Sequence, residues 1–373
     1  MKKLIALIIA LFVMFTMPGC TTNAPVSNDK VSIVCTIFPQ YDWVREILGG
    51  AASDFDLTLL LDSAVDLHSY QPSVQDIAKI SASDLFIYVG GESDLWVEDA
   101  LKEAINPDMM VINLLDALGD DAKIEEIIEG MQEEEDHDHG EHEDHDEADH
   151  DEGAHEDHDE AGHDEDEHED HDEDEHEDGH ETDEAHTHGE EIVYDEHVWL
   201  SLRNAETLCA VIADTLSAMI PENAAVYAAN CAAYIERLQA LDAEYAAAVA
   251  AAPEKTLLFA DRFPFRYLAD DYGISCFAAF PGCSAETEAS FETIAFLTTK
   301  TNELDLANIM VTETGDWAIA RTIIANSAAK NQNILVLNAL QSVTSANVAD
   351  GTSYLGVMAD NLEVIANALA YAE

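Results

Sequence analysis

Histidine and acidic side chains are concentrated in one tract of the sequence, residues 136–188. This tract holds all but two of the 16 histidines, and neither Lys nor Arg occurs between Ile124 and Leu202. Neutral imidazole and carboxylate groups are together the usual ligands of Zn²⁺ and neighbouring divalent cations. Because the tract has almost no apolar residues, it cannot form a packed core. We therefore predict a disordered loop that binds several metal ions weakly, with a purely solubilising acidic segment as the alternative. Its histidines are His137, His139, His142, His145, His150, His155, His158, His163, His168, His171, His176, His180, His186 and His188.

The two remaining histidines, His68 and His197, lie on either side of this tract. We expect each of them to follow the end of a strand, where α/β proteins bind ligands. A single histidine is more often a hydrogen-bonded structural residue than a metal ligand, so that alternative stays open for both. Two histidines alone would also make a weak zinc site, because zinc normally takes four close donors.

The N-terminus has the layout of an export signal. Two lysines are followed by an apolar stretch that ends near Phe15, and then by Gly19 and Cys20. The cysteine after a small residue resembles the cleavage box of bacterial lipoproteins, which implies a lipid on Cys20 and attachment to the outer face of a membrane. We therefore expect residues 1–20 to be a signal peptide and residues 21–30 a tether, with ordinary secretion or a retained N-terminal anchor as the alternatives.

Composition excludes several classes of function. A formal net charge of −63 disfavours nucleic acid and favours cations as partners. The sequence has no Gly-rich phosphate loop, no nucleophile elbow and no Cys-x-x-Cys redox pair, and no histidine is left over to act as a general base. We therefore predict that the protein is not an enzyme.

Five cysteines remain beyond Cys20, so at most two disulfides and one free thiol are expected in an oxidising compartment. Proximity in sequence favours a bond between the last two, although other pairings stay open. These cysteines are Cys35, Cys209, Cys231, Cys276 and Cys283.

The rest of the chain alternates apolar, β-branched runs with amphipathic stretches, a pattern typical of parallel βαβ units. We predict helices at 204–219, 221–251 and 353–371, and the second of these is long enough to join two domains rigidly. The two lobes would leave a cleft at the carboxyl ends of their strands. The predicted strands are 31–37, 56–61, 85–89, 110–114, 256–260, 274–280, 309–312 and 334–337.

These elements predict an α/β protein with two lobes, each built on a parallel sheet, and a metal cleft between them. We assign residues 31–132 to the N-terminal lobe, 133–191 to the disordered acidic loop, 192–220 to the end of the N-terminal lobe, 221–252 to the linking helix and 253–373 to the C-terminal lobe.

The surroundings of the two isolated histidines resemble the zinc- and manganese-uptake family of ABC-transporter substrate-binding lipoproteins. In that family the first metal ligand lies in a P-H-x-Y-x-P loop, which His68, Tyr70 and Pro72 match in part. The second ligand lies in a D-P-H-x-W segment, which His197 and Trp199 match. An acidic, His-rich loop before the second ligand is typical of the zinc-specific branch.

The resemblance continues through Asn204, the long helix, the pair Phe265 and Tyr267, and Gly273. It therefore covers nearly the whole mature chain. It implies two metal ligands, His68 and His197, and delivery of the ion to an ABC permease and its ATPase.

The chain departs from the family pattern at the remaining ligands. The third family ligand lies three residues before the Phe of F-x-Y, where this chain has Arg262, which cannot lose its proton to bind a metal. We predict that the adjacent Asp261 takes that place. The fourth ligand lies in an L-D-P-L strand end, where this chain has Asn338, which offers only a neutral carbonyl.

Three further acids could complete the site. Glu313 matches a family residue that is mainly structural or orients other groups, whereas Glu286 and Glu288 could equally be helix N-terminal carboxylates or exposed charges. Arg262 could instead pair with one of these acids and fix its orientation.

The sequence thus predicts an exported, membrane-anchored receptor that captures Zn²⁺, or alternatively Mn²⁺, in its cleft and passes it to the permease. One alternative is a surface metal buffer with a degenerate cleft, and a second is an adhesin. A receptor retains one tightly bound ion when the acidic tract is deleted, whereas a buffer does not.

The tract itself gives a prediction that depends on pH. Free histidine titrates near pH 6.5, and neighbouring carboxylates favour its charged form, so protons compete with metal at higher pH than for an isolated imidazole. Calorimetry on the peptide 136–188 should show at least about two zinc ions at pH 7.5 and a steep loss of binding by about pH 5.5. Fewer ions, or binding that is independent of pH, would mean that the tract is only an acidic spacer.

Overall fold

The computed structural model describes residues 30–63, 65–132, 193–284 and 288–370, all of which belong to one compact unit. The predicted signal peptide with Cys20, nearly all of the tether, the acidic loop 133–191 and Glu286 lie outside the described residues. Within the described part of the chain, no helix combines the length and the apolar character needed to cross a membrane.

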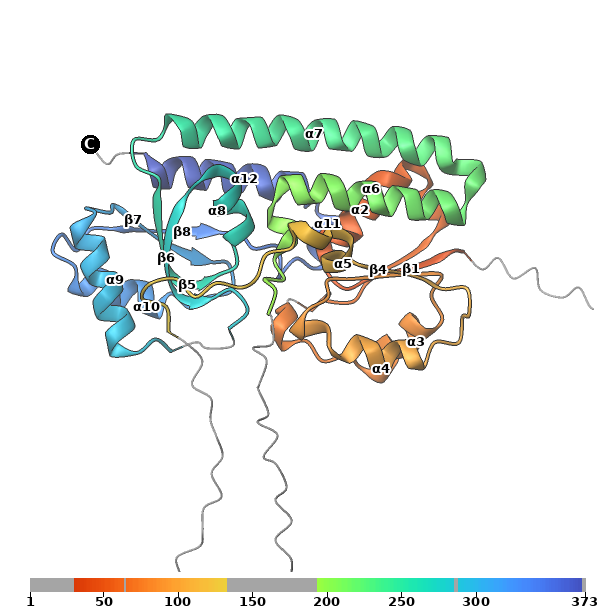
Figure 1. Cartoon of the computed structure of the whole chain (residues 1–373), viewed down its shortest axis with the longest axis horizontal. Coiled ribbons are helices and arrows are strands. Elements are labelled where there is room, and N and C mark those ends of the chain that lie inside the picture. The colour runs from red at the N-terminus through yellow and green to blue at the C-terminus, as the bar shows by residue number, and fades with distance from the viewer. Residues whose placement is uncertain (1–29, 64, 133–192, 285–287, 371–373) are drawn as a thin grey trace, which may run out of the picture. The chain divides into compact units, whose positions relative to one another are not determined.

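The N-terminal lobe is a four-stranded parallel sheet in the order β2-β1-β3-β4 (Figure 1). Helices follow most of the strands, as parallel pairing requires. The strands are β1 Ser32–Cys35, β2 Asp56–Leu59, β3 Leu85–Tyr88 and β4 Met110–Asn113, and the helices are α2 Phe38–Leu48, α3 Val74–Ser81, α4 Trp96–Lys102 and α5 Leu114–Leu118.

The C-terminal lobe repeats this arrangement, with a parallel sheet in the order β6-β5-β7-β8. All eight predicted strands are confirmed. The central strands β1, β3, β5 and β7 are mostly buried, as expected of parallel sheets covered by helices, whereas the edge strands β2, β4 and β8 are partly exposed. The strands are β5 Thr256–Phe263, β6 Ser275–Pro281, β7 Asn308–Thr312 and β8 Asn333–Leu337, and the helices are α8 Arg266–Tyr272, α9 Phe291–Glu303 and α10 Ala318–Asn326. The short helix α11 Ser345–Ala349 lies beside the N-terminal lobe, where the Ser345 backbone N–H donates to Asp62 (Figure 1).

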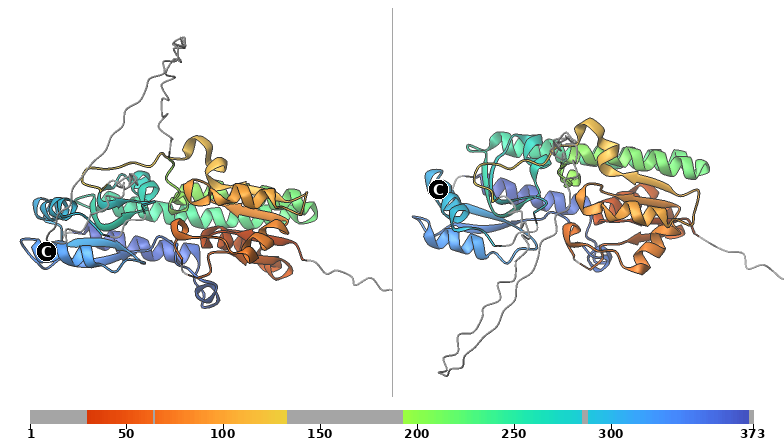
Figure 2. Two further views of the ribbon diagram at one scale, coloured as in Figure 1. Left: turned by 90° about the horizontal axis from the view of Figure 1, so that it is seen from below. Right: turned by 60° about the horizontal axis from the view of Figure 1, so that its bottom comes forward.

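Three longer helices follow the N-terminal sheet or close the chain: α6 Leu202–Met219, α7 Ala224–Ala251 and α12 Tyr354–Leu369. Helix α6 packs on α2, α5 and α7, whereas α7 and α12 contact elements of both lobes. Helix α7 contacts α2 and α6 on one side and α8 and α12 on the other, and at 28 residues it is about 42 Å long. It starts later than predicted, because Pro221–Asn223 forms a separate 3₁₀ turn. Helix α12 also reaches α2, so α7 is not the sole connection that we predicted (Figure 2).

Tyr354 fixes the start of α12 to the N-terminal lobe. Its backbone N–H donates to Asp42 at 2.8 Å, its hydroxyl donates to the carbonyl of Trp199 at 2.6 Å, and its fully buried ring packs edge-on against Trp43. One hydrophobic core therefore runs from the N-terminal sheet through α6, α7 and α12 into the C-terminal sheet.

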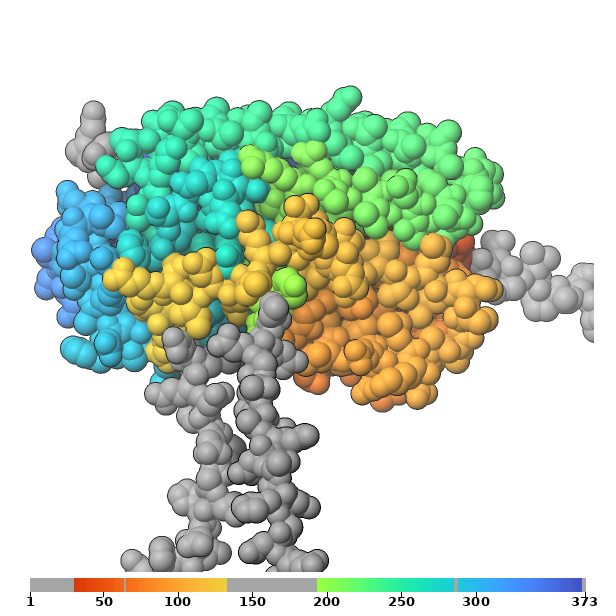
Figure 3. Space-filling model, viewed as in Figure 1, coloured from red at the N-terminus to blue at the C-terminus, as the bar shows by residue number. Residues whose placement is uncertain are grey.

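Residues 122–132 form a strap that leaves the N-terminal lobe and lies across the C-terminal lobe (yellow in Figure 3). The backbone N–H of Gln132 donates to the carbonyl of Ala279 at 2.9 Å, and that of Lys123 donates to the Tyr267 hydroxyl at 2.8 Å. The end of the segment that we assigned to the N-terminal lobe is thus held by the C-terminal lobe.

All five described cysteines are free, so the expected bond between Cys276 and Cys283 is absent. Cys276 lies near the start of β6, and Cys283 follows its end. Five residues of extended strand, Phe277 to Pro281, and Gly282 lie between the two cysteines. The strand part alone separates them by roughly 17 Å, far beyond the reach of a disulfide. Proximity in sequence was misleading because the intervening segment is a strand and not a turn.

Removing the Tyr354 hydroxyl tests whether this residue couples the lobes. Tyr354→Phe leaves the buried Trp199 carbonyl without its donor, and we expect it to lower the free energy of unfolding by about 1–2 kcal/mol. Tyr234→Phe is the matched control, because the buried Tyr234 hydroxyl has no hydrogen-bond partner among the described residues. Urea denaturation of both metal-free variants measures the difference, and equal stabilities would contradict the proposed coupling.

Candidate metal centre

His68 lies in the 3₁₀ turn Leu67–Ser69, which follows β2. Asp66 caps this turn by accepting a hydrogen bond from the His68 backbone N–H at 3.0 Å. On the imidazole, Nδ1 lies 2.7 Å from the Ser93 hydroxyl and 3.5 Å from a carboxylate oxygen of Glu196. These contacts orient the ring so that Nε2 points away from its own lobe.

We expected His197 to follow the end of a strand, but it does not. It lies three residues after Tyr194, which forms an isolated bridge with Ile124. Its ring is fully buried. The Asp195 carboxylate accepts the His197 backbone N–H at 2.8 Å and lies 3.0 Å from Nδ1. Such a carboxylate partner fixes the proton on Nδ1, so Nε2 carries the lone pair. In this structure the side-chain amide nitrogen of Gln341 lies 2.9 Å from Nε2, and a metal ion would take the place of that contact.

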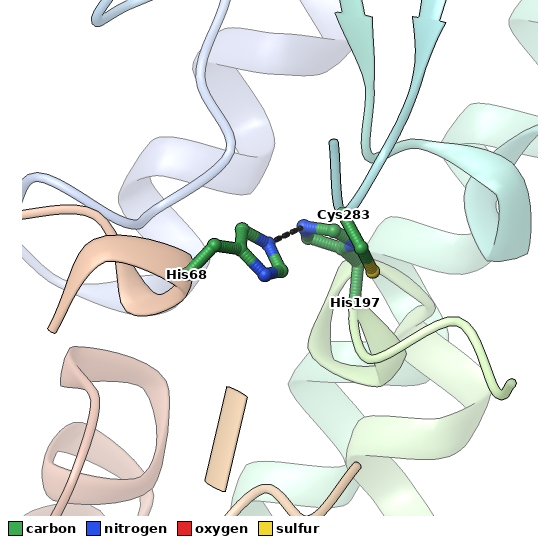
Figure 4. A group of neighbouring side chains, drawn as sticks. All are labelled: His68, His197 and Cys283. Carbon is green, nitrogen blue, oxygen red and sulfur yellow. Dashed lines mark hydrogen bonds between the residues drawn. The ribbon is translucent and has the colours of Figure 1, made fainter. Parts of the chain in front are cut away.

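The two histidines meet at the boundary between the lobes, with their Nε2 atoms 3.2 Å apart (Figure 4). Bond lengths of about 2.0–2.1 Å would place two nitrogen ligands on a tetrahedral zinc ion about 3.3 Å apart. Burial, together with the nearby His197, lowers the pKa of His68 to about 3, so its ring is neutral at ordinary pH. The pair therefore has the spacing of metal ligands, and the His68 ring is in the neutral form that binds metal.

Cys283 is the third residue of this group, and sequence reasoning considered it only for a disulfide. One ring nitrogen of each histidine and the Cys283 sulfur all lie within 4.8 Å of one another. Its backbone N–H donates to Glu125 at 3.1 Å. Burial and three nearby acids raise the pKa of the free thiol. The sequence did offer one indication that Cys283 could be a ligand, because it follows β6 at the carboxyl end of the strand, where α/β proteins bind ligands.

Asp261 and Arg262 are adjacent residues of β5, and their side chains contact different groups. The Asp261 carboxylate accepts hydrogen bonds from the Thr312 backbone at 3.0 Å and the Thr312 hydroxyl at 2.7 Å, so the structure does not bring it to the histidines. The pairing of β5 with β6 shifts register between Phe259 and Arg262, so strict alternation of side chains does not hold in this stretch. The contacts themselves show that the Asp261 carboxylate points to Thr312, whereas Arg262 points to Asp66.

Arg262 faces the other lobe and forms an ion pair with Asp66 at 2.5 Å, not with any of the acids that we considered. Burial opposes the charge of Asp66, but the guanidinium outweighs it and lowers the pKa of this carboxyl. A pocket of about 570 Å³ opens beside the pair, and Asp261 and Trp317 of the C-terminal lobe are among the residues that line it. Arg262 thus anchors the turn that carries His68.

Glu313 and Asn338 shape the loop that follows β8. The Glu313 carboxylate accepts the backbone N–H groups of Ala339 at 2.8 Å and Gln341 at 3.3 Å, and Asn338 accepts that of Leu340 at 2.7 Å. These bonds present the Gln341 side-chain amide, whose nitrogen lies 2.9 Å from His197 Nε2. Both residues therefore build the wall behind His197.

Glu288 is exposed on the rim of the pocket, and no contact joins it to the histidines. Glu196, which sequence reasoning missed, is buried and binds the Ser93 backbone N–H at 2.8 Å. Burial raises its pKa to about 7. A Cβ on Gly91 would lie 2.4 Å from this carboxylate, so the close approach requires glycine there.

Comparison with known proteins places this geometry in a family. The model of the zinc-uptake complex component A, periplasmic, matches residues 33–368. The zinc-binding lipoprotein AdcA of Streptococcus pneumoniae serotype 4 is 30% identical over 98% of this chain, which spans 60% of that protein. The high-affinity zinc uptake system protein ZnuA of Bacillus subtilis is 26% identical over 93% of this chain and 90% of its own length.

Solved structures agree with this placement. The Zn(II)-bound ZnuA-like domain of S. pneumoniae AdcA has a TM-score of 0.61 at 26% identity and covers 92% of this chain and all of that domain. The periplasmic zinc-binding protein TroA of Treponema pallidum, at 17% identity, has a TM-score of 0.64 and covers 92% of this chain and 100% of its own, and it supports the fold. With a family match over nearly all of the described residues, the chain belongs to the family of periplasmic zinc-uptake complex component A proteins.

Proposed function

We propose that this protein captures one zinc ion between its lobes and delivers it to an ABC permease. The observation that carries the proposal is the convergence of His68 and His197, with Nε2 atoms 3.2 Å apart. Relatives named as a zinc-binding lipoprotein and as part of a zinc uptake system support the same cargo. The family consists of binding components of uptake systems and not of enzymes.

The setting of the protein is part of the proposal. The relatives are periplasmic or lipoproteins by name, which supports an extracytoplasmic location. We infer that Cys20 carries the lipid anchor, and that a permease with its ATPase receives the ion, as the family resemblance implies. The acidic tract 136–188 would raise the metal concentration near the cleft.

The geometry explains why zinc would be held tightly yet exchangeably. Both imidazoles are oriented before the ion arrives, by Asp195 and Glu196, so little ordering is needed on binding. One ligand belongs to the turn after β2 and the other to the segment before α6. If either segment moved away from the bound zinc ion, the ion would lose one of its two nitrogen donors.

Substituting the histidines tests the cleft. In a chain lacking residues 136–188, His68→Ala and His197→Ala should each weaken binding of the tight zinc ion at least tenfold, about 1.4 kcal/mol. Competition with a chelating dye measures the affinity.

Asp261→Asn is the control for these variants, since its oxygen still accepts a hydrogen bond while its charge is lost. It should leave the zinc affinity close to that of the parent. Parental affinity in both histidine variants would reject the cleft, and loss of affinity in Asp261→Asn alone would move the site toward Thr312.

A further inference from the structure

We propose that Cys283 binds the cargo ion through its sulfur, as the third protein ligand beside His68 and His197. This inference rests on the proposed function, because it concerns the same ion. Among the described cysteines, acids and histidines, Cys283 is the one that forms a three-residue group of possible metal ligands with this pair.

The segment that carries Cys283 is fixed against the His197 ring from two sides. A Cβ on Gly282 would lie 3.1 Å from two atoms of that ring and 2.9 Å from the Phe263 carbonyl, so only glycine permits this approach. On the other side, Glu125 of the strap binds the Cys283 backbone N–H at 3.1 Å. The position of the sulfur therefore depends on both lobes and on the strap.

The distances suit an ion that draws the donors together. Zinc–sulfur bonds of about 2.3 Å and zinc–nitrogen bonds of about 2.0–2.1 Å separate nitrogen and sulfur donors by about 3.6 Å. The present atoms lie within 4.8 Å of one another, so a shift of about 1 Å suffices. Side-chain rotation of Cys283 can supply such a shift without moving its anchored backbone.

Charge in the same region favours a bound cation. The carboxylates of Asp195 and Glu196 lie 3.0 and 3.5 Å from the Nδ1 atoms of the two histidines. One oxygen of Glu196, a residue only 1% exposed, accepts no hydrogen bond among the described residues. A divalent ion bound to a thiolate and two neutral imidazoles would carry a net positive charge that these acids offset.

A thiolate ligand would also decide which metal the cleft selects. Soft sulfur ligands favour zinc over manganese, which prefers carboxylate, carbonyl and water oxygens. The third family position holds Arg262, which cannot bind a metal, so Cys283 would replace an oxygen or nitrogen donor with sulfur. We infer that the site is specific for zinc because of Cys283.

Cobalt substitution tests this in the full chain. Co²⁺ bound to a thiolate has a near-ultraviolet sulfur-to-metal absorption band, which the cysteine-free tract 136–188 cannot produce. Wild type and the control Cys276→Ser should show the band at one equivalent of Co²⁺, and Cys283→Ser should lose it. Cys283→Ser should also bind zinc at least tenfold more weakly, and Cys283→Asp should narrow the preference for zinc over Mn²⁺ at least tenfold.

The outcomes separate this inference from the proposed function. A tight ion that depends on His68 but gives no sulfur band in wild type would overturn the role of Cys283 and leave the cleft intact. A sulfur-to-metal band that persists in Cys283→Ser would also overturn the role of Cys283, because another thiol would then be the ligand. Absence of any tight ion in wild type would overturn the proposed function itself.

Discussion

Two imidazole nitrogens held 3.2 Å apart, from histidines 129 residues apart in the chain, are the arrangement on which the rest of the structure depends. Neither ring could keep this position alone. Asp195 orients His197, and the next residue, Glu196, reaches across to His68, so one short segment serves both rings. Because each of these two consecutive acids contacts a different histidine, the segment can be buried although it carries two acidic residues.

The sequence was sufficient for the fold because buried parallel strands are short apolar runs that can be recognised without tertiary information. His68 and His197 were identifiable because they stand apart from the tract in distinctive local motifs. Cys283 was not, because its role depends on where the end of β6 meets the histidines in space. The contacts of Asp261 were not predictable for a different reason: β5 shifts register between Phe259 and Arg262, and only the structure shows that Asp261 binds Thr312 while Arg262 binds Asp66.

Arg262 occupies the place where the family resemblance implies a third metal ligand. A cation beside a metal site would repel the ion, but its charge is taken up by Asp66, whose pKa it lowers. The same carboxylate caps the turn of His68. The pair is partly buried, so removing either partner would leave the other charge poorly compensated. Arg262 thus positions the turn that carries His68.

The continuous core has a consequence for how the ion leaves. Trp199 donates its indole N–H to the Ala339 carbonyl at 2.9 Å and accepts from Tyr354, which ties the segment of His197 to the far lobe and to α12. Separating the lobes as rigid bodies would expose this apolar interior to water. If zinc is the cargo, as proposed, its release through small displacements of the Leu67–Ser69 turn and the loop after β8 would avoid that cost. Local loop fluctuations, and not a wide hinge motion, would then govern how long the ion stays bound.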